Sequence, residues 1–165
     1  MSGSANFSPC GLYRYRLERL LESGDGTVLW VMLNPSTADA DHDDNTIRRV
    51  KAFSQSWGFR RALVGNVYAF RSTNPRGLWT ADDPTGPDNP KHLHEMAAEA
   101  SLIIAAWGQH VKRADVEPVE DLLRMYGNVW CLGTGRGEKP KHPLMLPADT
   151  QRTLYAPRLH RPEVA

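Results

Sequence analysis

The sequence has few cysteines, no long apolar run and no marked excess of charge of either sign. Cys10 and Cys131 lie far apart and outside any Cys-x-x-Cys pattern, so neither a disulfide framework nor a zinc site is indicated. No stretch approaches the roughly 18 apolar residues of a membrane span, and the N-terminus lacks an apolar signal region. We therefore expect a cytoplasmic protein with two reduced thiols and no membrane partner.

The formal net charge of +1 excludes a global cationic field, so any contact with nucleic acid needs a local basic patch. The chain has 165 residues, of which 41% are hydrophobic, and it contains no repeat and no long linker. This size favours a single domain over residues 1–165. We expect its polar ends, residues 1–11 and 158–165, to be flexible.

Four apolar runs are typical of strands that are covered on both faces of a parallel sheet. They span residues 27–33, 61–70, 102–108 and 128–133. Apolar spacing and capping residues predict helices over residues 45–58, 89–100 and 116–126. Alternating aromatic and arginine residues favour an additional early strand or hairpin over residues 12–21.

Strands that alternate with helices predict an α/β protein. We expect a three-layer sandwich around a mostly parallel core sheet of four strands. Ligands bind to such sheets beyond the carboxyl ends of the strands. Polar segments follow three of the expected strands, at residues 34–37, 66–71 and 133–144.

Asn34 directly follows the first core strand, and Pro35 restricts the backbone of Asn34 to extended geometry. A carboxamide fixed in this way could hold a water molecule or a substrate amide. Asn34 and Ser36 could equally organise a turn, because both residue types are common in turns. The residues by themselves leave both interpretations open.

Four aspartates surround His42 in the next segment, namely Asp39, Asp41, Asp43 and Asp44. They could bind a hard cation or supply a general base. Asp43 or Asp44 could instead cap the following helix, whose N-terminus favours negative charge. The segment lacks the spacing of a calcium-binding hand, and we expect no metal site.

Asn66 interrupts an apolar strand, where an amide is disfavoured unless hydrogen bonds compensate for its burial. It could be a satisfied core amide or a reader of a ligand. His142 shares a loop with Arg136, Lys139 and Lys141, which could meet a phosphate or a developing negative charge. A solvated histidine is the alternative. The Gly-Thr-Gly-Arg-Gly run of this loop lacks a Gly-Lys-Ser/Thr ending, which argues against a nucleoside triphosphatase.

The segment Met-Leu-Asn-Pro-Ser-Thr-Ala-Asp, which begins at Met32, resembles the signature of a bacterial family of uncharacterised domains, domain of unknown function 1643. Trp-Gly-Phe at residues 57–59, the run at residues 66–75 and His-Pro-Leu at residues 142–144 extend the resemblance over most of the chain. This family resemblance implies little about activity.

The order of several motifs is also similar to the uracil-DNA glycosylase superfamily. Residues 33–36 resemble the Asn-Pro-Gly motif of its mismatch-specific branch, where the asparagine positions the attacking water. Residues 63–70 resemble the strand whose asparagine reads the pyrimidine edge, and residues 103–108 resemble its Leu-Leu-Trp-Gly strand. Residues 141–144 resemble the closing His-Pro motif, whose histidine stabilises charge on the departing base.

This resemblance implies a uracil-DNA glycosylase-like fold in which Asn34 and His142 are catalytic and Asn66 reads the base. The closing motif here ends in leucine, where the superfamily has a serine that contacts phosphate. The segment after Asn34 has no Phe or Tyr to stack on a base, which leaves His42 as the planar side chain. The candidate substrate-binding residues are therefore Pro35, Ser36, Asn66 and His42.

We expect a hydrolase that cleaves the N-glycosidic bond of a damaged or modified pyrimidine nucleotide, flipped out of its stack, without a cofactor. Its partner would be DNA or a nucleotide, with phosphate contacts from Arg136, Lys139 and Lys141. The alternatives are a noncatalytic nucleic-acid-binding module and an enzyme that acts on a nucleoside or nucleotide. The sequence leaves the oligomeric state open.

Overall fold

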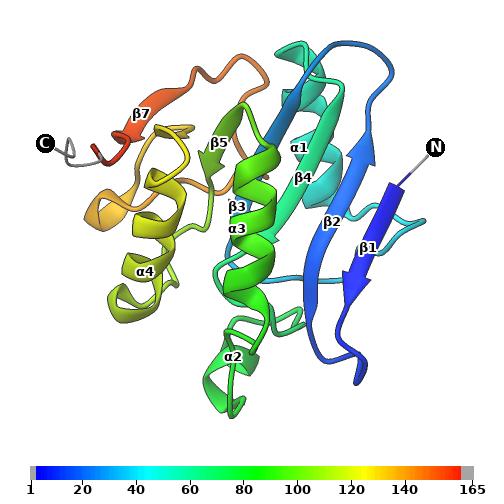
Figure 1. The fold of residues 1–165 in the computed structure, drawn as a ribbon, viewed down its shortest axis with the longest axis vertical. Helices are drawn as coiled ribbons and strands as arrows, with labels where there is room; N and C mark the ends of the chain where they lie inside the picture. The colour runs from blue at the N-terminus through cyan, green and yellow to red at the C-terminus, as the bar shows by residue number, and fades with distance from the viewer. Residues whose placement is uncertain (1–2, 161–165) are drawn as a thin grey trace, which may run out of the picture.

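The computed structural model describes residues 3–160 as a single sheet with helices on both of its faces (Figure 1). The alternation of strands and helices confirms the predicted α/β class. Seven strands are arranged in the order β1-β2-β4-β3-β5-β6-β7. Their bounds are β1 (Gly3–Phe7), β2 (Arg14–Leu20), β3 (Thr27–Met32), β4 (Arg61–Asn66), β5 (Leu102–Ala105), β6 (Val129–Cys131) and β7 (Thr153–Ala156).

The sheet is mixed and larger than the four strands expected from the sequence. Strands β4, β3, β5 and β6 are parallel neighbours, whereas β1, β2 and β7 pair in antiparallel fashion at the two edges. The β1 and β7 segments lack a continuous apolar run because each lies at an edge and is largely open to solvent. Their sequences therefore give only a weak strand signal.

The polar N-terminal segment, which composition assigned to a flexible end, contains β1. Its residues pair with β2 in a register that places Gly3 opposite Arg19. Backbone hydrogen bonds to β2 hold this segment, and such bonds do not depend on apolar side chains. At the other end, the backbone N–H of Arg158 donates to Asn128 Oδ1 (2.8 Å). Residues 1–2 and 161–165 lie outside the described residues.

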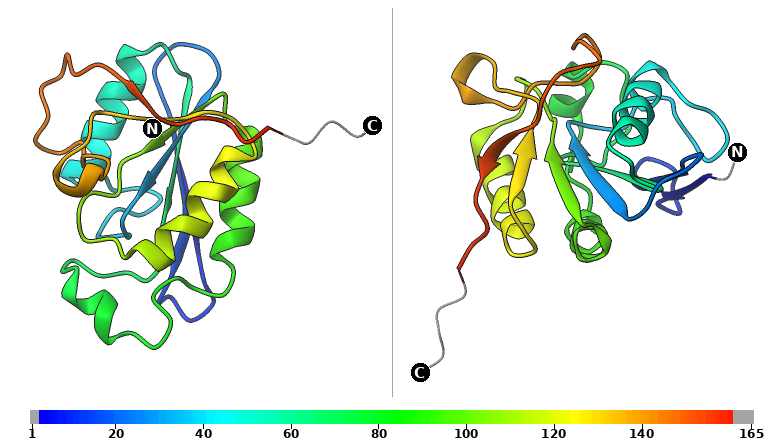
Figure 2. Two further views of the ribbon diagram at one scale, coloured as in Figure 1. Left: turned by 90° about the vertical axis from the view of Figure 1, so that its left-hand side faces the viewer. Right: turned by 90° about the horizontal axis from the view of Figure 1, so that it is seen from above.

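The helices are divided between the two faces of the sheet, as Figure 2 shows. Helix α1 (Asn45–Ser56) covers one face, and α3 (Asn89–Glu99) and α4 (Arg113–Arg124) cover the other. A short α2 (Arg76–Thr80) and a 3₁₀ turn (Arg136–Glu138) complete the helical elements. No helix in residues 3–160 is long and apolar enough to cross a membrane.

Helix α1 illustrates how local sequence builds this arrangement. Its apolar residues Ile47, Val50 and Phe53 recur at helical spacing and are buried against Trp30 of β3. Full burial of an apolar side chain of this size contributes about 1.5–3 kcal/mol. The helix thus fixes its own N-terminus next to the carboxyl end of β3, where the pocket described below begins.

Candidate ligand pocket

A pocket of about 600 Å³ lies where the four parallel strands end. Its walls come from the segments that follow β3, β4, β5 and β6, from the N-terminus of α1 and from the start of β2. This is the edge at which α/β sheets bind ligands. The polar residues that line it are Arg14, Asn34, Ser36, Asp44, Thr46, Asn66, Ser72, Thr73, Gln109, His110, Lys139, Lys141 and His142.

The pocket brings together three residues that sequence analysis singled out in three separate segments. Asn34 follows β3, Asn66 ends β4 and His142 lies in the segment after β6. Further candidates in its lining are Ser36, Asp44, Lys139 and Lys141. The candidates outside its lining are Pro35, His42, Asp43 and Arg136.

The side chain of Asn34 is fixed by the segment that follows β4. Its Nδ2 donates to the carbonyl of Ser72 (2.8 Å) and to that of Pro35 (3.1 Å), and the Pro35 carbonyl also accepts from Ser72 N. Both amide hydrogens are therefore used by the backbone. The acceptor Oδ1 is the atom that Asn34 can offer to a water molecule or a ligand in the pocket.

Asn66 is a buried amide without protein partners. It is 1% exposed, and neither its Nδ2 nor its Oδ1 has a hydrogen-bond partner among the described residues. Leaving a buried polar atom unpaired costs on the order of 1–3 kcal/mol. Because the sequence left a satisfied core amide as the alternative, this observation favours the interpretation of Asn66 as a ligand reader.

The backbone of Asn66 is held by a residue that sequence analysis treated only as a helix start. Asn89, also 1% exposed, donates from Nδ2 to the carbonyls of Asn66 (2.9 Å) and Val67 (3.2 Å). The helix cap of α3 is the preceding residue, Asp88. Asn89 thus positions Asn66, a role that only the contact across 23 residues reveals.

His142 presents a defined hydrogen-bonding state. The backbone N–H of Leu144 donates to its Nδ1 (3.2 Å), so the neutral ring carries its proton on Nε2. Burial lowers the pKa of His142, an effect that the charge of Asp44 opposes. With an ordinary pKa near 6.5 and a downward shift, the ring is neutral at pH 7 and Nε2 is a donor.

A backbone hydrogen bond joins the segment that carries His142 to the segment after β5. Gly108 N donates to Pro140 O (2.9 Å), which ties the segment after β5 to the one that carries His142. Gly108 has φ +75°, in the left-handed region that favours glycine. Gly108 therefore has a backbone role next to the segment that carries His142.

Asp43 and Asp44 are adjacent in sequence but differ in role. Asp44 caps α1, because its Oδ1 accepts from Ile47 N (2.9 Å), and it also lines the pocket. Asp43 instead pairs with Arg19 (2.7 Å) and Lys51 (2.8 Å). Burial alone would raise the pKa of Asp43, but hydrogen bonds from Lys51 and Arg19 outweigh it and lower the pKa. Of the two, only Asp44 is placed to act on a ligand.

His42 lies on the surface outside the pocket. Its side chain is 80% exposed, and its Nδ1 pairs with Asp39 Oδ1 (3.0 Å). The same Asp39 oxygen accepts from Asp41 N (2.9 Å) and His42 N (2.8 Å), so it organises the turn. Within residues 3–160, no group of three or more His, Cys, Asp or Glu side chains could hold a metal ion. Asp39 thus organises the turn and Asp44 caps the helix, whereas Asp43 forms ion pairs.

The three expected phosphate contacts are separated by the fold. Lys141 is exposed and lines the pocket, whereas Arg136 is exposed in the 3₁₀ turn and lies outside the lining. Lys139 lines the pocket, but its Nζ donates to the carbonyls of Gln109 (2.9 Å) and Val111 (3.3 Å). Lys139 thus ties two segments together, and Lys141 is the member of the group that is most open to a ligand.

The pocket lining also contains three residues that the sequence did not indicate, namely Arg14, Gln109 and His110. Arg14 is 3% exposed at the start of β2. The signal that could have indicated it is a charged residue inside a strand that carries large apolar side chains. The register that directs its side chain, however, depends on the neighbouring strands.

Fold and pocket together define an α/β protein with a polar pocket at the carboxyl end of its parallel strands. The family described as "Protein of unknown function (DUF1643)" matches residues 14–144. The chain belongs to this family. No curated protein and no solved structure matches the chain.

Proposed function

We propose that the protein is an N-glycosidic-bond hydrolase that acts on a damaged or modified pyrimidine nucleotide, in the manner of uracil-DNA glycosylases. One observation carries the proposal: the unpaired, buried amide of Asn66 shares a pocket with the fixed amide of Asn34 and the Nε2 donor of His142. The pocket volume of about 600 Å³ is in the range of small-molecule sites.

Asn66 would read the base. Its amide offers one donor group and one acceptor side by side, which complements the donor and acceptor edge of a pyrimidine. Pairing with a base would satisfy both orphaned atoms of Asn66 at once. This gives the substrate a binding contribution that the free protein lacks.

His142 and Asn34 would act on the bond that breaks. The bond between the sugar C1′ and the base nitrogen breaks with its electron pair on the base, and His142 Nε2–H would donate to the oxygen on which that charge accumulates. A water oriented by Asn34 Oδ1 would attack C1′. The pocket carboxylate of Asp44 is the candidate acceptor for the proton of that water. The products are a free base and an abasic sugar.

The test is a panel of single-stranded and duplex oligonucleotides that carry uracil, mismatched thymine or modified pyrimidines, with uridine and its monophosphate alongside. Abasic-site formation and release of free base are measured for the natural protein, Asn34→Ala and Asn66→Ala. Asn128→Ala is the matched control, because Asn128 is exposed and precedes β6 at the opposite end of that strand. We expect base release that both pocket variants lose and the control keeps.

The panel also separates the alternatives. Binding to oligonucleotides without release of any base would replace the hydrolase with a noncatalytic binding module. Turnover of uridine or its monophosphate in the absence of turnover of oligonucleotides would indicate an enzyme of free nucleosides or nucleotides. No binding and no release across the panel would reject the proposed function.

A further inference from the structure

Strand β2 carries three arginines, and their partners differ. Arg16 pairs with Glu99 (2.8 Å) and Glu18 (3.0 Å), and Arg19 pairs with Asp43 (2.7 Å). Arg14 forms no ion pair with any carboxylate of the described residues, although it is 3% exposed. Two arginines of the strand thus form ion pairs, whereas the one that lines the pocket forms none among residues 3–160.

A β-bulge directs Arg14 into the pocket wall. Asn6 of β1 pairs with Arg16 and the next residue, Phe7, pairs with Arg14, so Tyr15 is an extra residue in β2. A bulge of this kind shifts the alternation of side chains along a strand and re-aims the residue beside it.

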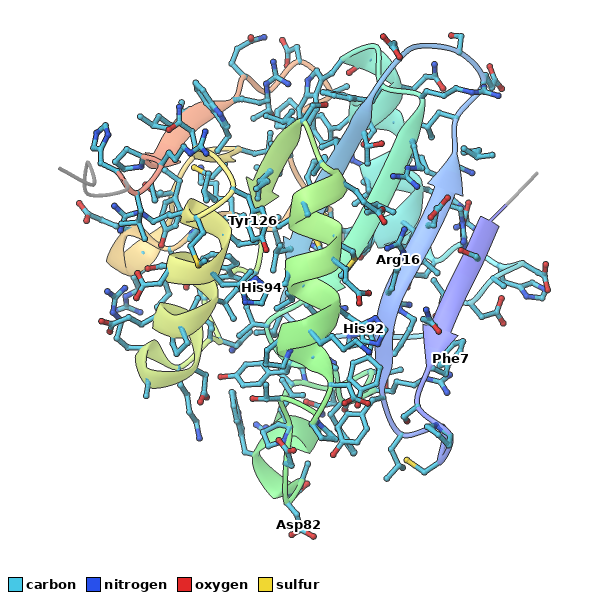
Figure 3. All side chains as sticks on the ribbon, in the orientation of Figure 1. Phe7, Arg16, Asp82, His92, His94 and Tyr126 are labelled. Carbon is cyan, nitrogen blue, oxygen red and sulfur yellow. The ribbon has the colours of Figure 1, made fainter. Side chains whose placement is uncertain are left out.

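The neighbours of these side chains show the effect of the bulge. Tyr15 stacks on His92 of α3 (4.8 Å between ring centroids) and Arg16 reaches Glu99 at the end of α3. Figure 3 shows Arg16 and His92 between β2 and α3. Arg14, two residues before Arg16, instead borders the pocket with the first turn of α1.

The guanidinium of Arg14 is only partly satisfied. Its Nη1 donates to the Ala38 carbonyl (2.7 Å), while its buried Nε has no partner among the described residues and no hydrogen bond leaves its Nη2. Burial lowers the pKa of Arg14 to about 10, and the charge of Asp44 only partly opposes this, so Arg14 remains charged at pH 7. A buried charge without a counter-ion is costly.

The two unpaired nitrogens of Arg14 are suited to binding an anion. Nε and Nη2 form the edge of the guanidinium that binds two oxygens of a carboxylate or phosphate side by side. The same wall contains the orphaned amide of Asn66, contributed by β4, the neighbour of β2. A ligand that carries both an anionic group and an amide-like edge would give hydrogen-bond partners to Arg14 and to Asn66.

We propose that Arg14 is a specificity-determining residue that binds the anionic oxygens of the ligand, either a carboxylate on the base or a nucleotide phosphate. The inference rests on the proposed use of the pocket as a ligand site, but not on hydrolysis. A ligand that carries a hydrogen-bonding base edge and no negative charge would leave Arg14 unpaired and bind more weakly.

The test compares four probes at constant ionic strength: orotate, uridine monophosphate, uracil and inorganic phosphate. Dissociation constants and thermal shifts are measured for the natural protein, Arg14→Met and Arg14→Lys. The control is Arg16→Met, which removes an arginine of the same strand from the opposite face. Arg14→Lys retains the charge but cannot reproduce the two-point contact, and Arg14→Met removes both the charge and the contact.

We expect orotate or uridine monophosphate to bind the natural protein roughly 10- to 100-fold more tightly than either Arg14 variant, the effect of one charged hydrogen bond. Uracil binding should change less than threefold. Tight binding of orotate alone identifies a carboxylated base, and tight binding of uridine monophosphate alone identifies a phosphate. Without a probe, Arg14→Met should melt at the same or a higher temperature, because an unpaired buried charge is removed.

Three results would overturn the inference. One is that no anionic probe binds the natural protein more tightly than Arg14→Met; another is that uracil loses as much affinity as orotate. The third is that Arg16→Met produces the same loss. Base release by the oligonucleotide panel is scored separately, so failure of hydrolysis with discrimination of anions intact removes only the proposed reaction.

Discussion

The α3 face of β2 and the pocket differ in how their polar side chains are paired. On the α3 face, Arg16, Arg61, Glu18 and Glu99 form a closed network in which Glu99 accepts from Arg16 (2.8 Å) and Arg61 (3.0 Å). The hydrogen bond from Arg16 lowers the pKa of Glu99. In the pocket, the Nε of Arg14 and both polar atoms of Asn66 have no hydrogen-bond partner among the described residues. The ion pairs of the α3 face stabilise the fold. The unpaired groups of the pocket do not, and a ligand would give them partners.

The largest effect is expected for a substitution of His142 in the pocket. If its Nε2–H donates to charge that develops on the departing base, His142→Gln should slow base release roughly 100- to 1,000-fold with little change in affinity. The measurement is single-turnover base release at saturating enzyme on the substrate that the panel identifies. An unchanged chemical rate would end the assignment, and a parallel loss of stability would indicate a packing role.

The adjacent aspartates give the next largest contrast. Asp43→Asn leaves Arg19, whose side chain is 4% exposed, without a charged partner, and should lower the free energy of unfolding by about 3 kcal/mol. Asp44→Asn keeps a good helix cap and should cost less than about 1 kcal/mol. Urea unfolding of both variants measures these changes. Equal losses would show that Asp44 is as structural as Asp43.

A third pair contrasts a satisfied buried polar group with an orphaned one. Ser54 is 0% exposed, accepts from Trp30 Nε1 (2.9 Å) and donates to Val50 O (2.7 Å). Ser54→Ala should cost about 1–3 kcal/mol because the indole N–H loses its acceptor. Asn66→Leu breaks no bond in the free protein, so its unfolding free energy should be unchanged or higher. Calorimetry measures the unfolding free energy of both variants. A large destabilisation by Asn66→Leu would contradict the role of Asn66 as a ligand reader.

The smallest effect concerns pH. Burial lowers the pKa of His142 in the pocket and that of His92 on α3. An unfolded histidine then binds a proton that the folded one does not, so stability is full above about pH 6.5 and is lost as pH falls through the folded pKa. His92→Gln and His142→Gln should each flatten the dependence of unfolding free energy between pH 7.5 and 5. An unchanged slope in either variant would show that the pKa of that histidine is the same in the folded and unfolded states.

The sequence predicted the parts of the fold that rest on strong local patterns. The spacing of Ile47, Val50 and Phe53 predicted α1, and the apolar runs predicted the four parallel strands. The strands β1 and β7 escaped prediction because edge strands need no apolar run, and α2 escaped because it is only five residues long. Local periodicity carries little information about elements of this kind.

The residues of the candidate site also differ in how well the sequence predicted them. Asn34 and Asn66 stood out because each places an amide at or in an apolar strand, and His142 stood out because it shares a loop with basic residues. All three line the pocket. Sequence could not separate Asp43 from Asp44, since the choice depends on Arg19, which lies 24 residues from Asp43. It also placed Arg136 with Lys141, although the 3₁₀ turn carries Arg136 out of the pocket lining.

The sequence by itself determined the order along the chain of β2 to β6 and of the three longer helices, and the polar character of the segments that follow the parallel strands. These features follow from the side chains of near neighbours. Only the tertiary structure decided which polar atoms are paired. Arg16 finds Glu99 at a separation of 83 residues, while the bulge at Tyr15 turns Arg14 toward the pocket and away from that partner. Hydrogen bonding and ion pairing depend on distances that only packing of the whole chain sets, and an orphaned group is recognisable only after every other group has found its partner.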